Sequence, residues 1–173
     1  MKEETFSSKT MLATLYKVKN NKAKKRFIFD QTPIGGIGSK WVKLFFISLP
    51  ILLYIGIFNP KIFGMLGIAQ AIIFYVVFLS MVMIMIVALT FINNNKVIRQ
   101  ITPSWNALFP TVDLKQLLSS GASPYSSFIE KYNALLAMNL DEKSFESKLK
   151  ENFVEMQKEN KELYEAMNRN HVS

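Results

Sequence analysis

The stretch "IFGMLGIAQAIIFYVVFLSMVMIMIVALTFINNN" (residues 62–95) contains 34 residues without a single charge. A helix on the surface of a soluble protein needs a polar face, and no such face can be drawn on this segment. At about 1.5 Å per residue, its apolar part, residues 65–92, would be about 42 Å long, whereas the hydrocarbon core of a bilayer is about 30 Å thick. We therefore predict a membrane-spanning helix that tilts or extends past the interface.

A second apolar segment, "WVKLFFISLPILLYIGIF" (residues 41–58), precedes the first. Seventeen uncharged residues separate Lys43 from Lys61, which is slightly short for a span, but a lysine near the end of a helix can extend to the headgroups. Between the two segments, Asn59-Pro60 is a turn signal because proline cannot continue the incoming helix. The pattern predicts a transmembrane hairpin over residues 41–92, with its tip at residues 59–64.

Positive charge is concentrated before the first span. Residues 1–43 hold ten Lys/Arg against three Asp/Glu, whereas residues 96–173 hold ten of each. Because the cytoplasmic flanks of membrane helices carry the excess of Lys and Arg, we expect both termini on the cytoplasmic side of the membrane.

Residues 1–40 are expected to form a basic arm. Met11, Leu12, Leu15 and Tyr16 fall at helical spacing before a run of six basic residues, which predicts a short amphipathic helix lying on anionic lipid headgroups. A protein partner is the alternative, and contact with nucleic-acid phosphates is less favoured. Residues 33–40 lack the spacing of a phosphate-binding loop and are expected to be a flexible joint. The residues expected to contact lipid or a partner are Lys17, Lys19, Lys22, Lys24, Lys25, Arg26, Trp41, Lys43 and Trp105.

The spans carry no acidic residue, arginine or histidine, which argues against a pump or a voltage sensor. Gln70 is expected either to bond a partner helix or to meet headgroups. Gly67 and Ala71 are spaced for close helix packing. The chain has no cysteine, and its single histidine, His171, is expected in a solvated tail. No catalytic group of residues is apparent, so we expect a protein that is not an enzyme and binds no metal or cofactor.

After the spans, we expect an irregular connector over residues 93–110 and a cytoplasmic helical module over residues 111–173. Helices are predicted over residues 112–119, from the Ser123-Pro124 cap to about residue 138, and over residues 141–168. The apolar stripes of the last two helices should pack on each other and on a partner subunit. These stripes contain Phe128, Ile129, Tyr132, Leu135, Leu136, Phe145, Leu149, Phe153, Met156, Leu163 and Met167.

Together these features predict an all-α membrane protein. Its basic leader "KKRFIFDQTPIGGIGSKW" (residues 24–41) followed by a tight hairpin resembles the small two-helix inner-membrane subunits of bacterial conjugation and type IV secretion machines, over residues 24–95. The resemblance implies a scaffold in an envelope-spanning transfer complex, with other integral membrane subunits and anionic lipids as partners. The alternatives are an oligomeric pore former and a membrane anchor that recruits a soluble protein.

Overall fold

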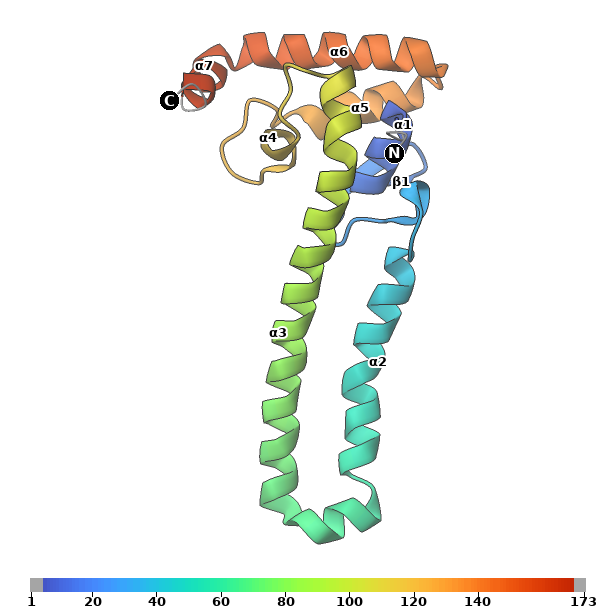
Figure 1. Cartoon of the computed structure of the whole chain (residues 1–173), viewed down its shortest axis with the longest axis vertical. Coiled ribbons are helices and arrows are strands. Elements are labelled where there is room, and N and C mark those ends of the chain that lie inside the picture. The colour runs from blue at the N-terminus through green and yellow to red at the C-terminus, as the bar shows by residue number, and fades with distance from the viewer. Residues whose placement is uncertain (1–4, 170–173) are drawn as a thin grey trace. The chain divides into compact units, whose positions relative to one another are not determined.

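The computed structural model describes residues 5–169 of the chain, so the expected tail position of His171 lies outside the described residues. Helices dominate the structure, and one antiparallel pair of strands accompanies them (Figure 1). The predicted helical class is therefore confirmed, although the strands are absent from the prediction.

The chain divides into two compact units. The first, called the module below, combines the chain up to Arg26 with everything from Val97 onward. The second, called the apolar unit, is Phe27–Lys96. Residues 5–26 thus fold together with the C-terminal helices, whereas the sequence predicted a separate basic arm over residues 1–40.

Helix α1 (Ser8–Leu15) begins the module. The Ser7 hydroxyl caps it by accepting a hydrogen bond from the Thr10 N–H at 3.3 Å. Met11, Leu12 and Leu15 are at most 1% exposed, so the apolar face of α1 lies in the protein core. This corrects the prediction that α1 lies on headgroups, because its apolar side chains are already covered by protein.

Strands β1 (Tyr16–Lys19) and β2 (Lys22–Lys25) follow directly and form a two-stranded ribbon. Asn20 and Asn21 connect them with φ angles of 51° and 56°. A two-residue turn with both φ angles positive matches the twist of the strands, and asparagine tolerates that conformation well. The local sequence therefore favours a tight hairpin here rather than a longer helix.

Helix α3 (Pro60–Leu108) extends beyond the apolar stretch, so residues 93–108 are helical and not an irregular connector. Val97, Ile101 and Trp105 recur every four residues and are completely buried in the module. Proline in a helix interior costs about 3 kcal/mol, and Pro103 stands in this segment. Burial of three large apolar side chains outweighs that cost.

The module is completed by four helices: α4 (Leu114–Leu118), α5 (Phe128–Ala137), α6 (Glu142–Glu159) and α7 (Lys161–Arg169). Its core is rich in aromatic rings. The Phe128 and Phe153 rings stack with centroids 5.6 Å apart, and Trp105 meets Phe109 at 4.7 Å. The Trp105 indole N–H also donates to the Val112 carbonyl at 2.8 Å.

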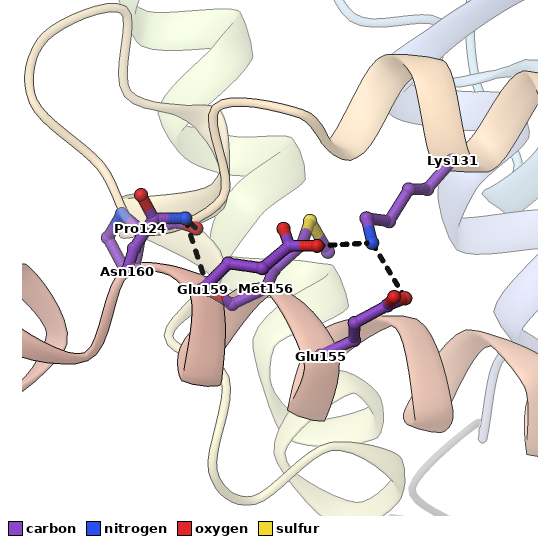
Figure 2. A network of polar contacts seen from close by, with 6 residues as sticks. All are labelled: Pro124, Lys131, Glu155, Met156, Glu159 and Asn160. Atoms are coloured by element: carbon purple, nitrogen blue, oxygen red, sulfur yellow. Dashed lines mark hydrogen bonds and ion pairs between the residues drawn. The ribbon is translucent and has the colours of Figure 1, made fainter.

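Two helix boundaries differ from the prediction. Helix α5 begins at Phe128 rather than directly after the Ser123-Pro124 pair, although the Ser123 hydroxyl accepts the Tyr125 N–H at 3.2 Å and donates to the Gln116 carbonyl at 2.8 Å. The predicted helix over residues 141–168 is divided at Asn160 into α6 and α7. The Asn160 side chain donates to the carbonyls of Pro124 and Met156, at 3.0 and 3.1 Å, and thereby ties the break to the loop before α5 (Figure 2).

In the apolar unit, a short 3-10 turn, η1 (Thr32–Ile34), precedes α2 (Ser39–Ile57), and a short turn connects α2 to α3 (Figure 1). Asn59 begins α3 by accepting the Lys61 N–H at 3.1 Å. Gly67 then interrupts the helix with φ 74° and ψ 164°. The tip predicted at residues 59–64 is therefore largely helical, and the long apolar helix begins after Gly67.

Candidate membrane and partner surfaces

The two long helices of the apolar unit present their apolar side chains outward. Only 11% of an apolar 18-residue window in α2 is buried, and only 6% of such a window in the helix that begins at Gly67. Both helices are long and apolar enough to cross a membrane. Ile47 and Leu52 in α2 are 65% and 62% exposed, and Ile84 in α3 is 70% exposed. An exposed apolar surface of this extent needs lipid or other protein to cover it.

A pair of asparagines closes one end of the apolar unit. The Asn94 side chain accepts the Phe29 N–H at 2.9 Å and donates to the Phe27 carbonyl at 2.8 Å. The Asn93 side chain accepts from the Gln31 amide at 2.9 Å and donates to the Phe29 carbonyl at 3.3 Å. This set of contacts, the asparagine clamp, fastens the segment before α2 to α3 just after the last apolar residue.

The glycine-rich segment between the clamp and α2 has a defined conformation. Asp30 accepts hydrogen bonds from the Thr32 hydroxyl at 2.6 Å and from the Ser39 N–H, at the start of α2, at 3.4 Å. Gly36 has φ 135°, and a Cβ placed there would lie 2.7 Å from the Gln31 side-chain oxygen. Glycine is therefore required at this turn by the backbone conformation. The sequence had predicted only a flexible joint here.

Aromatic rings link α2 to α3 at the other end of the apolar unit. Tyr75 meets Tyr54 and Phe58 edge-on, at centroid distances of 6.2 and 6.1 Å. Phe58 also contacts Phe63 at 5.6 Å. Aromatic pairs in this geometry contribute roughly 0.5–1.5 kcal/mol beyond the area they bury, so the cluster helps to hold the connection between the helices.

The predicted close-packing motif does not form as a helical face. Gly67 lies outside the helical region of φ and ψ, so it cannot pair with Ala71 on a regular turn. Ala71 is nevertheless completely buried. Gln70 is exposed, and its side-chain oxygen lies 3.0 Å from the position that a Cβ on Gly67 would take. Neither expectation for Gln70, a partner helix or headgroups, is tested by these contacts.

Four lysines share one face of the β1–β2 ribbon. Lys17 lies opposite Lys24, and Lys19 lies opposite Lys22. Residues opposite each other in a ladder, and residues two apart in a strand, point to the same side of the sheet. All four side chains are exposed, and we call this set the lysine face.

The other side of the ribbon packs into the module. Tyr16 and Ala23 are 1% and 4% exposed, and the Ala23 N–H donates to the Asn133 side chain at 2.6 Å. Lys25 and Arg26, both predicted to contact lipid or a partner, also form hydrogen bonds within the module. The Lys25 amine donates to the Ser119 carbonyl and the Arg26 guanidinium donates to the Ala13 carbonyl, each at 3.2 Å.

The two tryptophans have opposite surroundings. Trp41, near the start of α2, is 70% exposed, and Lys43 is also exposed, as a contact with the interface requires. Trp105 was expected at the interface but is completely buried in the module, where its ring packs at 5.9 Å from Phe153. The reason is that Trp105 belongs to the buried stripe of α3 with Val97 and Ile101. The sequence did not predict this stripe, because Pro103 argued against a helix through this segment.

Most of the predicted partner stripe forms the core of the module itself. Each of the following residues is buried within this chain and is not available to a partner: Phe128, Tyr132, Leu135, Phe145, Leu149, Phe153 and Met156. The remaining members, which are only partly buried, are Ile129, Leu136, Leu163 and Met167. The reason for this correction is that α1 and the ribbon pack against α6 and α5, so the chain itself covers the seven buried side chains.

A groove of about 660 Å³ runs between α5 and α6. Lys131 lines it and pairs with Glu155 at 2.7 Å and Glu159 at 3.2 Å (Figure 2). The hydrogen bond with Glu155 raises the pKa of Lys131, and so the lysine remains charged. The exposed side chains of Met138 and Val154 add apolar surface to this groove.

Among the described residues, no cluster of three or more His, Cys, Asp or Glu side chains could hold a metal ion.

Two features of the structure were not predicted from the sequence. The alternation in "YKVKNNKAKK" around Asn-Asn is typical of a hairpin and could have revealed the lysine face. The asparagine clamp had no such local signal, because its partners are more than 60 residues apart.

Comparison with known proteins finds no matching family model, no curated relative and no solved structure of similar fold.

Proposed function

We propose that the chain is an integral membrane scaffold subunit, without enzymatic activity, whose helices α2 and α3 cross the bilayer as a hairpin and hold the module at the cytoplasmic surface. One observation supports this proposal above the others: the apolar windows of the two helices are only 11% and 6% buried. The core helix of a soluble protein would be mostly covered by its own chain, whereas here the side chains face outward.

The lengths of the helices agree with this proposal. Helix α2 has 19 residues, which corresponds to about 29 Å of rise, close to the roughly 30 Å of the hydrocarbon core. From Ile68 to Ile92, α3 rises about 37 Å, so this helix would tilt. The asparagine clamp would satisfy backbone groups near the interface, where exposed N–H and C=O groups become costly.

Charge supports one orientation. Lys40 and Lys43 stand at the start of α2, and Lys96 and Arg99 follow the apolar part of α3, whereas Lys61 is the only charge at the opposite end. We therefore propose that the module and both termini are cytoplasmic and that the Lys61 end is outside, in a bacterial inner membrane.

Single-cysteine labelling tests the topology, because the chain has no cysteine of its own. Lys61→Cys should react with a membrane-impermeant maleimide in intact bacterial cells. Lys143→Cys, on the exposed surface of α6, should react only after the membrane is permeabilised. Equal labelling of both variants in intact cells, or a chain that stays soluble without detergent, would contradict the proposal.

Extraction in mild detergent tests the scaffold role. We expect other integral membrane proteins to co-purify with the chain in a fixed ratio, measured by mass spectrometry of the isolated complex. The chain alone, expressed in otherwise unmodified cells, should leave the membrane potential unchanged. Rapid depolarisation on expression would instead favour a pore-forming oligomer. Purification of the chain as a monomer without any bound protein would contradict the scaffold role.

A further inference from the structure

We propose that the lysine face, Lys17, Lys19, Lys22 and Lys24, is a binding site for the phosphate groups of anionic phospholipids. This inference rests on the proposed membrane location and adds to it a defined ligand and a defined surface. Four ammonium groups on one side of a two-stranded ribbon form a compact positive patch. Opposite residues lie about 5 Å apart and neighbours along a strand about 7 Å apart, counted between Cβ atoms.

The arrangement is unfavourable for the ribbon itself. Like charges directly opposite each other destabilise a strand pair, and the register places two such pairs side by side. Within the part of the chain that the structure describes, none of the four lysines forms an ion pair with an acidic side chain. Phosphate groups bound to this face would relieve the repulsion, and lysine is a good ligand for phosphate.

The rest of the ribbon shows that the lysines are not needed for packing. Its inner side supplies the buried contacts, through Tyr16, Ala23 and the hydrogen bond to Asn133. Lys25, which lies on that inner side, uses its amine to bond the Ser119 carbonyl. The lysine face is thus exposed, while the opposite side of the ribbon is fixed by its contacts with the rest of the module.

A lipid surface fits this face better than nucleic acid. Single-stranded nucleic acids bind to positive grooves that also present aromatic rings for stacking, whereas the only ring on the ribbon, that of Tyr16, is buried on the other side. Lys24 lies three residues before Phe27, whose carbonyl bonds Asn94 at the end of the apolar stretch. Basic segments immediately next to a span are attracted to anionic headgroups.

Amine footprinting of the full chain in nanodiscs provides the test. The protein is placed in nanodiscs of phosphatidylcholine alone or with 30% phosphatidylglycerol, and acetylation of each lysine is followed by mass spectrometry. Lys143 and Lys158, which are exposed on α6, serve as internal controls. We expect acetylation of the lysine face to slow at least about fivefold with phosphatidylglycerol, and the controls to change less than about twofold.

Two variants sharpen the test. Replacing one cross-strand pair, Lys17→Gln with Lys24→Gln, should reduce the protection of Lys19 and Lys22. The matched control, Lys143→Gln with Lys158→Gln, should leave it unchanged. Raising the salt to 1 M should remove the protection, because the screening length falls to about 3 Å.

Each other outcome overturns the inference. Equal acetylation rates in both nanodiscs would exclude anionic lipid as the ligand. Equal protection by inorganic phosphate in phosphatidylcholine nanodiscs would assign the site to free phosphate. Protection by single-stranded RNA but not by phosphatidylglycerol would assign it to nucleic acid. A chain that fails to enter nanodiscs would refute the proposed membrane function itself, whereas a chain that enters without lipid-dependent protection refutes only the inference.

Discussion

The module and the apolar unit use the same residue types in opposite ways. In the module, Trp105 and Phe153 are at most 1% exposed, and their rings pack against other rings. In the apolar unit, Phe74 and Phe91 are 53% and 67% exposed. Hydrophobicity alone therefore does not decide what a side chain contacts. The module carries enough polar residues for each of its helices to have a solvent-facing side and a buried side. The part of α3 from Ile68 to Ile92, by contrast, has no charged residue on any side.

The largest expected effect comes from removing a large aromatic residue from each unit. Trp105→Ala should destabilise the module by about 3–5 kcal/mol, since it leaves a cavity and removes the hydrogen bond to Val112. Phe91→Ala, the matched change in the apolar unit, should leave the module unaffected. Hydrogen exchange of the α5 and α6 amides in detergent measures both effects. Similar exchange in the two variants would contradict the division into units.

A smaller effect is expected at the asparagine clamp. Asn94→Leu leaves the Phe29 N–H and the Phe27 carbonyl without their partner, which should cost about 1–3 kcal/mol locally. The Phe29 amide should then exchange faster with solvent. Asn95→Leu is the matched control, because the structure gives no side-chain hydrogen bond to Asn95. If both variants exchange alike at Phe29, the clamp does not hold the segment before α2.

Alkaline pH should weaken the module. Burial raises the pKa of Tyr132 to about 12, and burial also raises the pKa of Tyr16. Because the neutral phenol is favoured in the fold, stability should be constant below about pH 10, the ordinary tyrosine pKa, and fall as the pH rises towards 12. The slope should approach about 1.4 kcal/mol per pH unit for each tyrosine.

Urea unfolding of the full chain in detergent between pH 8 and 11.5 measures this decline. Tyr132→Phe should make the decline less steep, because the substituted ring cannot ionise. An unchanged slope in that variant would show that Tyr132 does not contribute to it.

The smallest expected effect concerns the groove between α5 and α6. Lys131→Met removes the pairs with Glu155 and Glu159, whose side chains are 56% and 48% exposed. Solvent screens such pairs, so the loss should be about 1 kcal/mol or less, and it should shrink at high salt. A double-mutant cycle with Glu155→Gln isolates the pair. A coupling well above this value would indicate that the groove is drier than its exposure suggests.

Several elements were predictable because their signals are local. The apolar runs and the Asn59-Pro60 turn each lie within a few residues of the structure they cause, and α2 and α6 begin within two residues of the predicted positions. The elements that were wrong depend on distant partners. The sequence placed Trp105 at a membrane interface and the α1 face on headgroups, because nothing nearby in the sequence shows that residues 5–26 fold with residues 97–169.

By itself, the sequence determined the two apolar helices and the uneven distribution of charge, since a long run of uncharged residues leaves a helix without a polar face. Only the tertiary structure decided which apolar side chains are covered by this chain, which lysines share one face of the ribbon, and which asparagines close the apolar unit. These properties depend on contacts between residues far apart in the chain, and the free energy of such contacts comes from packing and pairing that no local pattern encodes.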